Sequence, residues 1–553
     1  MTGLFIFSEF YGKVICMRKV ISAAEMREVD RLTTEKYGIP QILLMENAAH
    51  AAASAIKQKL GGTLADSSIL VLCGKGNNGG DGAALARILW QQGADVEVCL
   101  FGLVADTKDE ARVNFEILQK IADGEHFEVS QPDLAFEEIT SVEEWLEYDA
   151  LSFHSDDPDV IVDALFGTGL SRPLDGVFQQ VAAFIGAFQD DDSDGPMVVS
   201  LDMPSGLDSD KAEPIGVHAK VDLTVTFTAA KPANVLPPAS NSNGELFIAN
   251  IGSPCELIEA SSSQLFIAER SDAVDWLRAT RFKPNSYKNS RGHAMLITGS
   301  PDYSGAAVLC GNAAMRTGVG LVTIVTAERG AEAIVSRISP EVIVRRVSNA
   351  GAFDDIAPMF DTVDAIAIGP GLHVGEGTAG FVRQVLERAN KPVIVDADAL
   401  NCISPWDVFG TSDQPFILTP HEGEFRRIAG LDRAAKIGDR VSAARNFAGN
   451  HNVILILKGE RSLIAHPDGR VVVNPTGNPG LGKAGNGDTL TGIIAGFVAQ
   501  AVRTNLNIFQ TVVAAVYTAG LAGDIAAEAF GLRVMTGSDV RDSLAEAFNQ
   551  LDG

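Results

Sequence analysis

Short apolar runs alternate along the chain with longer segments in which apolar or small residues recur at helical spacing. The runs at residues 68–73 and 198–201 in the first half, and at 321–326 and 453–457 in the second, consist mainly of apolar and β-branched residues. Strands have this composition when both of their faces are covered, as in parallel sheets flanked by helices. The alternation of strand and helix patterns therefore predicts the α/β class for both halves.

The strand pattern is interrupted by a polar stretch that contains several serines. We interpret this stretch, residues 253–265, as a linker. A chain of 553 residues is too long to fold around a single hydrophobic core of ordinary size, so two domains are expected. We place the first domain at residues 17–255 and the second at residues 266–553. Residues 1–16 are expected to be an N-terminal extension, because they lack the basic start of a signal peptide and Met17 begins the regular pattern.

A glycine-rich stretch, residues 476–492, reads TGNPGLGKAGNGDTLTG. A helix with one apolar face is predicted after it from the spacing of Leu490, Ile493, Ile494, Phe497, Val498 and Ala501. Free amide groups at such a helix start suit a phosphate or a developing anion. Asp488, in the first turn, is therefore our candidate for a catalytic base. The alternative is a glycine cap followed by an Asp that only stabilises the helix.

A second glycine-rich segment, residues 74–82, follows the first strand pattern of the N-terminal half and reads GKGNNGGDG. It matches the G-x-G-x-x-G dinucleotide fingerprint, which is weak evidence by itself. We expect a loop here, with the helix beginning at Ala83. A diphosphate cradle needs only backbone groups, so the polar side chains of Asn77, Asn78 and Asp81 are expected to contact a sugar, a ring or a cation.

Two later strand patterns end in a carboxylate that precedes a glycine turn. Asp163 precedes the turn at residues 167–169, and Asp202 precedes Ser205. The carboxyl ends of strands line the ligand crevice in open parallel sheets, so these groups are expected to converge with residues 74–82. Either Asp alone could equally cap a turn.

The motifs NNGGDG, DALFGTG and DMPSGLD, in this order, resemble those of the NAD(P)H-hydrate epimerase domain, over about residues 17–251. The resemblance implies a Rossmann-like three-layer fold that interconverts the R and S epimers of hydrated NADH and NADPH at nicotinamide C6. It implies a potassium ion held by Asn78, Asp163 and Ser205. It also implies substrate contacts from Asn77, Asn78, Gly79, Gly80, Asp81, Gly167, Thr168, Gly169, Leu170, Ser171, Arg172, Pro173 and Asp202. Asp163 is our candidate for the acid–base catalyst that epimerisation needs.

Strand ends in the second half also carry polar side chains. Asp396, Glu422 and Glu424 are candidate magnesium-side groups, because hard oxygen ligands near a nucleotide phosphate suit Mg²⁺. Surface caps are the competing interpretation. His421 follows Thr-Pro at a strand end, a position that favours ligand contact over packing. Residues 458–462 offer amides and cations to a nucleotide phosphate.

The second half resembles the ribokinase-like NAD(P)H-hydrate dehydratase domain, over about residues 266–553. The resemblance rests on GPGL at 369–372, VDADALN at 395–401, LTPHEGE at 418–424 and the GNGD that ends at Asp488. It implies a ribokinase-like α/β fold and a magnesium- and ADP-dependent reaction. The C6 hydroxyl is phosphorylated, phosphate is then eliminated, and AMP is left.

The same resemblance implies further contacts. The substrate contacts are Ala306, His373, His421 and Asp488; the nucleotide contacts are Lys458, Gly459, Glu460, Arg461, Ser462, Gly485, Asn486 and Gly487. The chain departs from the family pattern ATGGTGD, where it reads GKAGNGD with Lys483 and Asn486. It also has His373 where the family has a glycine. These departures affect individual contacts more than the activity.

Charge and cysteine usage limit the partners. A net charge of -27 argues against binding to nucleic acid or to an anionic membrane. The six cysteines lie far apart without a C-x-x-C pair, as in reduced cytosolic proteins, so a cytoplasmic location is expected. No apolar run seen in the sequence reaches spanning length. The expected partners are hydrated NADH and NADPH, ADP, and further copies of the chain as a homo-oligomer.

Three alternatives were weighed. A ribokinase-like vitamin-precursor kinase fused to a Rossmann-like binding module shares the G-x-G-D motif but leaves the upstream epimerase motifs unexplained. A binding or scaffold protein with a degenerate first half is disfavoured by the intact polar residues there. An NAD-dependent dehydrogenase rests only on G-x-G-x-x-G and has no identifiable partner for hydride transfer.

Overall fold

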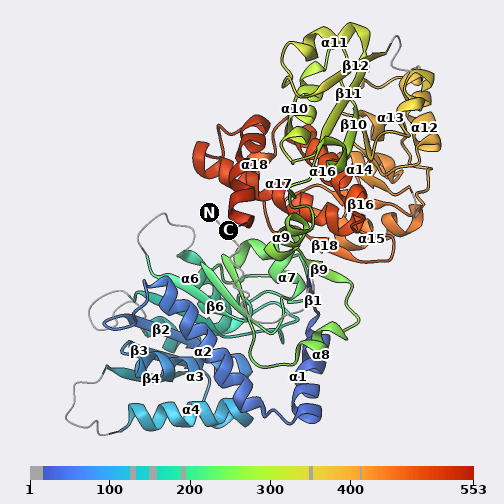
Figure 1. Cartoon of the computed structure of the whole chain (residues 1–553). Coiled ribbons are helices and arrows are strands. Elements are labelled where there is room, and N and C mark those ends of the chain that lie inside the picture. Colours follow the sequence, from blue (N-terminus) through green and yellow to red (C-terminus); the bar gives the residue numbers. More distant parts are fainter. Residues whose placement is uncertain are drawn as a thin grey trace. The chain divides into compact units, whose positions relative to one another are not determined.

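The computed structural model describes residues 17–124, 132–148, 158–188, 195–347, 353–411 and 414–552. The predicted extension, residues 1–16, lies outside the described residues. The chain divides into two compact units, which meet in sequence between Ser263 and Gln264 (Figure 1). The predicted linker is not a continuous loop, because it contains the short helix α8 (Cys255–Glu259).

The N-terminal unit is built on a seven-stranded sheet in which all the paired strands run parallel, in the order β4-β3-β2-β5-β6-β7-β8. The strands are β2 (Ser68–Cys73), β3 (Asp95–Phe101), β4 (Leu134–Ile139), β5 (Val160–Ala164), β6 (Met197–Leu201), β7 (Leu223–Phe227) and β8 (Glu245–Ala249), with β1 (Arg18–Val20) ahead of them in the chain. The other helices are α1 (Ala23–Tyr37), α2 (Gln41–Lys59), α3 (Asn77–Gln91), η1 (Val104–Asp106), α4 (Asp109–Ala122), α5 (Val142–Glu147), α6 (Gly176–Ala187), α7 (Pro232–Val235) and η3 (Ala239–Ser242).

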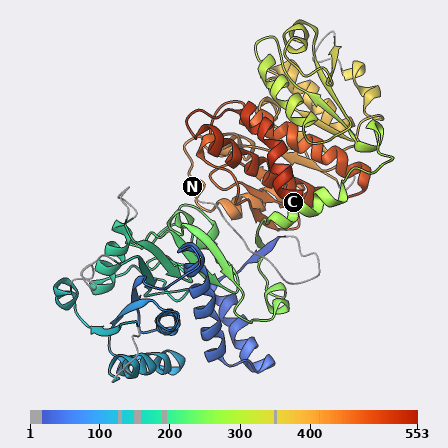
Figure 2. The same ribbon diagram turned by 60° about the vertical axis from the view of Figure 1, so that its left-hand side comes forward.

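Alternate residues of β2 show why this unit has three layers. Ile69 and Val71 belong to one buried cluster, which includes side chains of α2, α3 and α4. Leu70 and Leu72 belong to another, which includes Trp145 of α5 and residues of α6. Because successive strand residues point to opposite faces, both faces of the sheet are covered by helices (Figure 2).

The C-terminal unit has its strands in the order β9-β18-β17-β16-β15-β14-β13-β10-β11-β12. The strands from β16 to β12 pair in parallel, whereas β16, β17 and β18 form antiparallel pairs. The strands are β9 (Leu265–Ile267), β10 (His293–Ile297), β11 (Leu321–Ala327), β12 (Ile343–Val347), β13 (Ala365–Ile368), β14 (Val393–Val395), β15 (Phe416–Leu418), β16 (Ile454–Leu457), β17 (Leu463–Ala465) and β18 (Val471–Val473).

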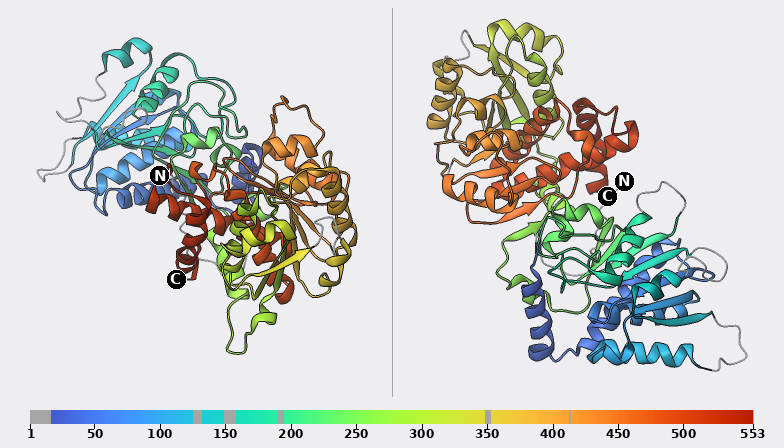
Figure 3. Two further views of the ribbon diagram at one scale, coloured as in Figure 1. Left: turned by 90° about the horizontal axis from the view of Figure 1, so that it is seen from above. Right: turned by 180° about the vertical axis from the view of Figure 1, so that it is seen from behind.

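Helices flank this second sheet as well (Figure 3). They are α9 (Arg270–Ala279), η4 (Lys288–Arg291), α10 (Ser304–Met315), α11 (Glu328–Val335), η5 (Phe353–Asp355), η6 (Ala357–Met359), α12 (Glu376–Arg388), α13 (Asp398–Cys402), α14 (Glu422–Ile428), α15 (Arg440–His451), η7 (Pro479–Leu481), α16 (Asn486–Thr504), α17 (Ile508–Phe530) and α18 (Gly537–Asp552). The predicted α/β class is confirmed in both units.

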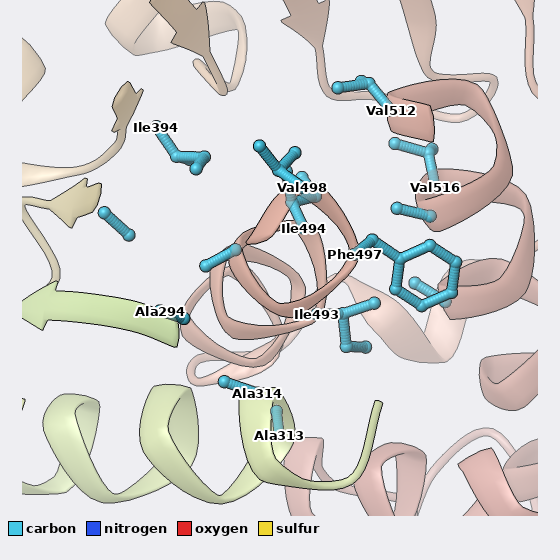
Figure 4. Close-up of a cluster of buried hydrophobic side chains, with 14 of the residues drawn as sticks. Ala294, Ala313, Ala314, Ile394, Ile493, Ile494, Phe497, Val498, Val512 and Val516 are labelled. Carbon is cyan, nitrogen blue, oxygen red and sulfur yellow. The ribbon is translucent and has the colours of Figure 1, made fainter. Parts of the chain in front are cut away.

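Helix α16 is the centre of the C-terminal core, and the prediction of a single apolar face for it is wrong. Every residue from Thr491 to Ala501 is buried. Figure 4 shows its side chains pointing to several sides, toward Ala313 and Ala314 of α10, Ile394 of β14, and Val512 and Val516 of α17. The apolar spacing identified the helix, but Gly492 and Gly496 allow α10 to approach a side that the pattern leaves without apolar side chains.

Among the described residues, one helix, α17, is long and apolar enough to cross a membrane by length and composition alone. This corrects the expectation that no run reaches that length. In the fold, 72% of its most apolar window is buried. The helix contacts α9, α16 and α18, as a core helix does.

Candidate active sites

The NNGGDG motif lies inside helix α3, which starts at Asn77, and not in the expected loop. The glycines permit close packing against the sheet. A Cβ atom on Gly79 would lie 1.7 Å from the Gly74 carbonyl oxygen, and one on Gly82 would lie 2.6 Å from the Ala164 Cβ. The glycines predicted a loop, whereas in the structure they allow a helix to lie close to the ends of the strands.

A cavity of about 460 Å³ opens at the carboxyl ends of β2, β5 and β6. Its lining includes seven of the thirteen substrate contacts predicted from the first-half motifs, namely Asn77, Asn78, Asp81, Gly167, Thr168, Gly169 and Asp202. The predicted contacts that do not line it are Gly79, Gly80, Leu170, Ser171, Arg172 and Pro173. Four charged residues that the motifs did not identify also line the cavity, namely Arg27, Asp30, Glu110 and Lys231.

Asp202 and Lys231 form the ion pair of this cavity. Lys231 is 1% exposed, and its ammonium group donates to Asp202 Oδ1, to Thr226 Oγ1 at 2.9 Å and to the Phe227 carbonyl oxygen at 3.1 Å. Asp202 has a φ of 64°, a strained conformation for a non-glycine residue, and such strain is common at functional sites. The pair therefore places in the cavity a carboxylate whose cationic partner is held in a fixed position. The Lys-Pro dipeptide after β7 was the available sequence signal for Lys231.

Two other carboxyl groups in the cavity have shifted proton affinities. Burial, followed by the charges of Asp202 and Asp30, raises the pKa of Asp81 well above its usual range. Burial raises the pKa of Asp30 to about 6; Lys231 opposes this shift and Asp202 adds to it. Neither carboxyl group has a hydrogen-bond partner within the part of the chain that the structure describes.

Asp163 is fully buried and does not line the cavity. Its Oδ1 accepts from Ser205 Oγ at 2.5 Å and from the Leu165 amide at 3.3 Å. Its Oδ2 accepts from the Ser205 amide at 2.8 Å and from Ser200 Oγ at 3.1 Å. Burial raises the pKa of Asp163, although these hydrogen bonds favour its ionised form. The geometry does not favour the catalytic role predicted for Asp163, because a substrate in the cavity does not reach its carboxylate.

The three potassium ligands predicted from the resemblance, Asn78, Asp163 and Ser205, lie around the turn after β5. Asn78 is 8% exposed, and neither its amide oxygen nor its amide nitrogen has a partner within the described residues. That oxygen lies 3.5 Å from where a Gly167 Cβ would be, and Ser205 Oγ bonds the neighbouring Phe166 amide at 3.0 Å. An unpartnered buried oxygen suits a cation, and the Ser205 hydroxyl connects the other two predicted ligands because it donates to Asp163 Oδ1.

The glycine-rich stretch of the second unit forms the start of α16, as predicted. Gly485 is its N-cap with a φ of 93°, and Asp488 lies in its first turn. Burial and the neighbouring Asp396 raise the pKa of Asp488 to about 6, with Lys458 opposing the shift. A carboxylate with this pKa is largely ionised at neutral pH and still able to accept a proton.

Asp396 connects three elements at this site. It is 1% exposed, accepts from Lys458 Nζ at 3.0 Å and from Thr491 Oγ1 at 2.7 Å. A Cβ atom on Gly487 would lie 3.6 Å from Lys458 Nζ, so this ammonium lies beside the amides of the helix start. Burial by itself would lower the pKa of Lys458, but Asp396 and Glu424 outweigh it and raise that pKa. The site therefore combines a base, an anion hole and a cation.

The predicted magnesium-side carboxylates do not gather into one group. Among the described residues, no group of three His, Cys, Asp or Glu side chains is placed to hold a metal ion. Asp396 is engaged by Lys458, and Glu422 pairs with Arg426 and Arg440. Glu424 accepts from the His421 amide at 3.0 Å. These residues therefore do not fit a magnesium site made of protein ligands alone.

The loop after β16 contains the predicted nucleotide contacts 458–462, and Arg440 lies against it. A Cβ atom on Gly459 would lie 2.2 Å from Arg440 Nη2. The Nε and Nη2 atoms of Arg440 are buried without a hydrogen-bond partner within the described residues, although Nε lies 3.3 Å from Glu422. The sequence interpretation missed Arg440, because it precedes the loop by eighteen residues. Arg461 instead donates to the Pro475 carbonyl oxygen.

Three other predicted contacts have clear local roles. His421 caps α14, where its Nδ1 accepts from the Gly423 amide at 3.0 Å, and its side chain is 57% exposed. His373 has a φ of 71°, which explains why a glycine is common at this position. Ala306, in the first turn of α10, packs against the turn at Gly371. None of these contacts excludes a ligand.

Lys483, a departure from the family pattern, fastens the glycine-rich stretch to the segment before α18. Its ammonium donates to the carbonyl oxygens of Leu532 at 3.1 Å, of Met535 at 3.0 Å and of Arg533. The departure therefore has a structural role.

Two α/β units, each with an acid–base site at the carboxyl ends of parallel strands, define a two-domain enzyme of small polar metabolites. Residues 41–233 match the family model described as YjeF-related protein N-terminus, and residues 294–545 match the one described as NAD(P)H-hydrate dehydratase. Relatives that are more than 30% identical over almost the whole chain show that it belongs to the family of bifunctional NAD(P)H-hydrate repair enzymes, which unite isomerase and lyase activities. The predicted family is thereby confirmed.

The similarity to named relatives covers almost the whole chain. The chain is 36% identical to the bifunctional NAD(P)H-hydrate repair enzyme Nnr of Moorella thermoacetica, over 96% of this chain and 97% of that protein. It is 34% identical to the enzyme of the same name in Thermofilum pendens, with the same coverage. Among solved structures, the ADP/ATP-dependent NAD(P)H-hydrate dehydratase of Bacillus subtilis is 33% identical, covering 50% of this chain and 97% of that chain, with a TM-score of 0.44.

Proposed function

We propose that the chain repairs hydrated NADH and NADPH at two separate sites. The cavity of the N-terminal unit interconverts the R and S hydrates at C6. The site at the start of α16 dehydrates the S hydrate, with ADP as phosphoryl donor and AMP and phosphate as products. The observation that carries the proposal is Asp488, a half-buried carboxylate in the first turn of α16 beside Lys458 and the free helix amides.

In the first step of dehydration, Asp488 takes the proton of the C6 hydroxyl while the oxygen attacks the terminal phosphorus of ADP. The amides of Gly485, Asn486 and Gly487 stabilise the charge on the phosphoryl group in flight, and Lys458 adds a positive charge. Phosphate then leaves C6 as the lone pair of the ring nitrogen forms a double bond to C6. Loss of a C5 proton completes the nicotinamide ring.

The nucleotide is assigned to the loop after β16. Residues 458–462 offer backbone amides there, and the unpartnered Nη2 of Arg440 is a charged donor for a phosphate oxygen. Since the described residues form no magnesium cage, a magnesium ion is expected to be held mainly by the phosphates and water.

In the N-terminal unit, Asn78, Asp163 and Ser205 would hold a potassium ion through oxygen atoms. The ion would supply positive charge beside the buried Asp163 carboxylate. Asp163 thereby acts on the Phe166–Gly167 turn and on Ser205 rather than on the substrate, as its hydrogen bonds to Ser205 support. Asn77, Asp81, Gly167, Thr168, Gly169 and Asp202 are the proposed substrate contacts in the cavity.

The net charge of -27 supports small-molecule partners rather than nucleic acid or an anionic membrane, and the separated cysteines support a cytoplasmic location. Homo-oligomer formation stays a prediction.

The experiment is to incubate the full chain with mixed R and S hydrates of NADH and with ADP or ATP. Regenerated NADH is followed by absorbance, and AMP by chromatography. The proposal expects both epimers to be consumed at an enzyme-dependent rate. Failure to regenerate NADH with either nucleotide would refute it, and recovery of only the S hydrate would refute the epimerase half.

A further inference from the structure

Asp163 is buried and does not line the cavity, so the acid–base groups of the epimerase step must be other residues. Epimerisation at C6 needs a proton for the leaving hydroxyl and a base for the water that returns from the other side. The charged groups that line the cavity are Arg27, Asp30, Asp81, Glu110, Asp202 and Lys231. The reaction therefore has several candidates, and their contacts separate them.

Asp202 and Lys231 form an ion pair and are poorly suited to transfer protons. All three donors of Lys231 are satisfied, by Asp202, Thr226 and Phe227. Asp202 is committed to Lys231 through Oδ1 and accepts from the Thr168 amide at 3.3 Å through Oδ2. Protonating Asp202 would leave the buried Lys231 charge without its counterion, which is costly. Asp202 therefore suits a fixed negative charge beside a cationic ring better than a proton carrier.

Glu110 also lines the cavity, but it is not among the charged groups that act on Asp30 or Asp81. Asp30 and Asp81 are therefore the two interacting carboxyl groups that remain beside the ion pair. Both line the cavity, they come from the separate elements α1 and α3, and neither has a hydrogen-bond partner within the described residues. They also lie close enough to Asp202, and to each other, for their charges to interact. Like charges in one cavity favour a state in which they share one proton.

We propose, on the basis of the repair function proposed above, that Asp81 and Asp30 are the catalytic acid and base of epimerisation. Asp81 gives its proton to the C6 hydroxyl, the C6–O bond breaks, and water leaves as the ring nitrogen's lone pair forms a double bond to C6. Water then adds to the opposite face of C6 and gives its proton to Asp30, and the electron pair returns to nitrogen. Proton exchange with solvent restores the pair, and exchanged roles serve the reverse direction.

The shifted proton affinities support this order. Burial and the charges of Asp202 and Asp30 raise the pKa of Asp81 well above its usual range, which favours the protonated form that an acid needs. The pKa of Asp30 is about 6, so this group is mainly ionised at pH 7 and able to act as a base. Asp202 supplies the negative charge that stabilises the cationic ring between the two proton transfers.

The test uses the full chain, the R hydrate of NADH alone, and chromatographic measurement of the S hydrate. The variants are Asp30→Asn and Asp81→Asn, and the matched control is Glu116→Gln, which removes an exposed carboxylate of α4 that does not line the cavity. We expect each Asp variant to lower kcat for epimerisation at least ~100-fold, with KM changed less than about 3-fold. The control is expected to keep wild-type kcat. Asn conserves the shape and the neutral charge of protonated Asp81, so the Asp81→Asn variant tests chemistry rather than folding.

A second measurement follows oxygen. In water enriched in ¹⁸O, the wild-type chain should place one solvent oxygen at C6 for each inversion. Inversion with the original oxygen retained would overturn the proposal, because ring opening would then replace hydroxyl loss. Near wild-type kcat in both Asp variants would also overturn it while leaving the repair function intact. A wild-type chain that does not interconvert the hydrates would instead refute the epimerase function itself.

Discussion

The rate of dehydration should titrate with Asp488. Burial and Asp396 raise its pKa to about 6, and Lys458 limits the rise. A base works in its ionised form, and with this pKa the ionised fraction is ~90% at pH 7 and ~10% at pH 5. The account therefore predicts that kcat/KM for the S hydrate falls about 10-fold between pH 7 and pH 5.

A substitution of Lys458 tests the direction of the electrostatic effect on the pKa of Asp488. Its positive charge favours ionised Asp488, so removing that charge in Lys458→Met should raise the pKa of Asp488 further. The acid limb of the profile is therefore expected to move to higher pH. In the wild type the limb should have its midpoint near pH 6.

The assay measures AMP formation from the S hydrate at saturating ADP, because reduced nicotinamides decay in acid and their absorbance would mislead. Saturation with ADP separates the effect on Asp488 from weaker nucleotide binding by the Lys458→Met variant. A profile that is flat from pH 5 to pH 8 would refute the assignment of Asp488 as base. A limb that stays in place in Lys458→Met would refute the electrostatic coupling.

Four further outcomes are expected. Asp488→Asn should lower kcat for dehydration ~10²–10⁴-fold and leave epimerisation unchanged, measured with the pure S and R hydrates. Arg440→Met should raise KM for ADP on the order of 10-fold with kcat nearly constant, as loss of one charged hydrogen bond does; an unchanged KM would remove Arg440 from the nucleotide site. Gly485→Ala should destabilise the C-terminal unit by about 1–3 kcal/mol in thermal unfolding, because its φ of 93° strains any other residue. Asp163→Asn should raise the potassium concentration needed for half-maximal epimerisation and leave dehydration intact, whereas an unaltered potassium dependence would contradict its place at the ion.

The α/β fold of both units and the strand ends at which the two candidate sites lie could be predicted from the sequence. Strand ends with carboxylates and glycines indicated the crevice because parallel strands deliver their carboxyl ends to one edge. Asp488 could be placed at a helix start from the glycine density and the apolar spacing after it. In each case the residues that gave the signal are neighbours in the chain, so no contact between distant segments was needed to predict their arrangement.

What the sequence did not show depends on contacts between distant segments. Asp163 looks like Asp202 in its motif, but only packing reveals that one is sealed by Ser200 and Ser205 and the other faces the cavity. Asp30 lies on α1, outside all the motifs that indicated site residues. Arg440 reaches its loop from the start of α15. None of these relations has a fixed spacing along the chain that a motif could report.

The most direct test of two separate activities in one chain starts from the R hydrate of NADH, ADP and the Asp488→Asn variant. The account predicts that the S hydrate accumulates at the wild-type rate of epimerisation while little NADH or AMP forms. The wild-type chain should convert the same R hydrate completely to NADH. Loss of S-hydrate formation in Asp488→Asn would contradict the separation of the sites, and undiminished NADH formation would contradict the role of Asp488.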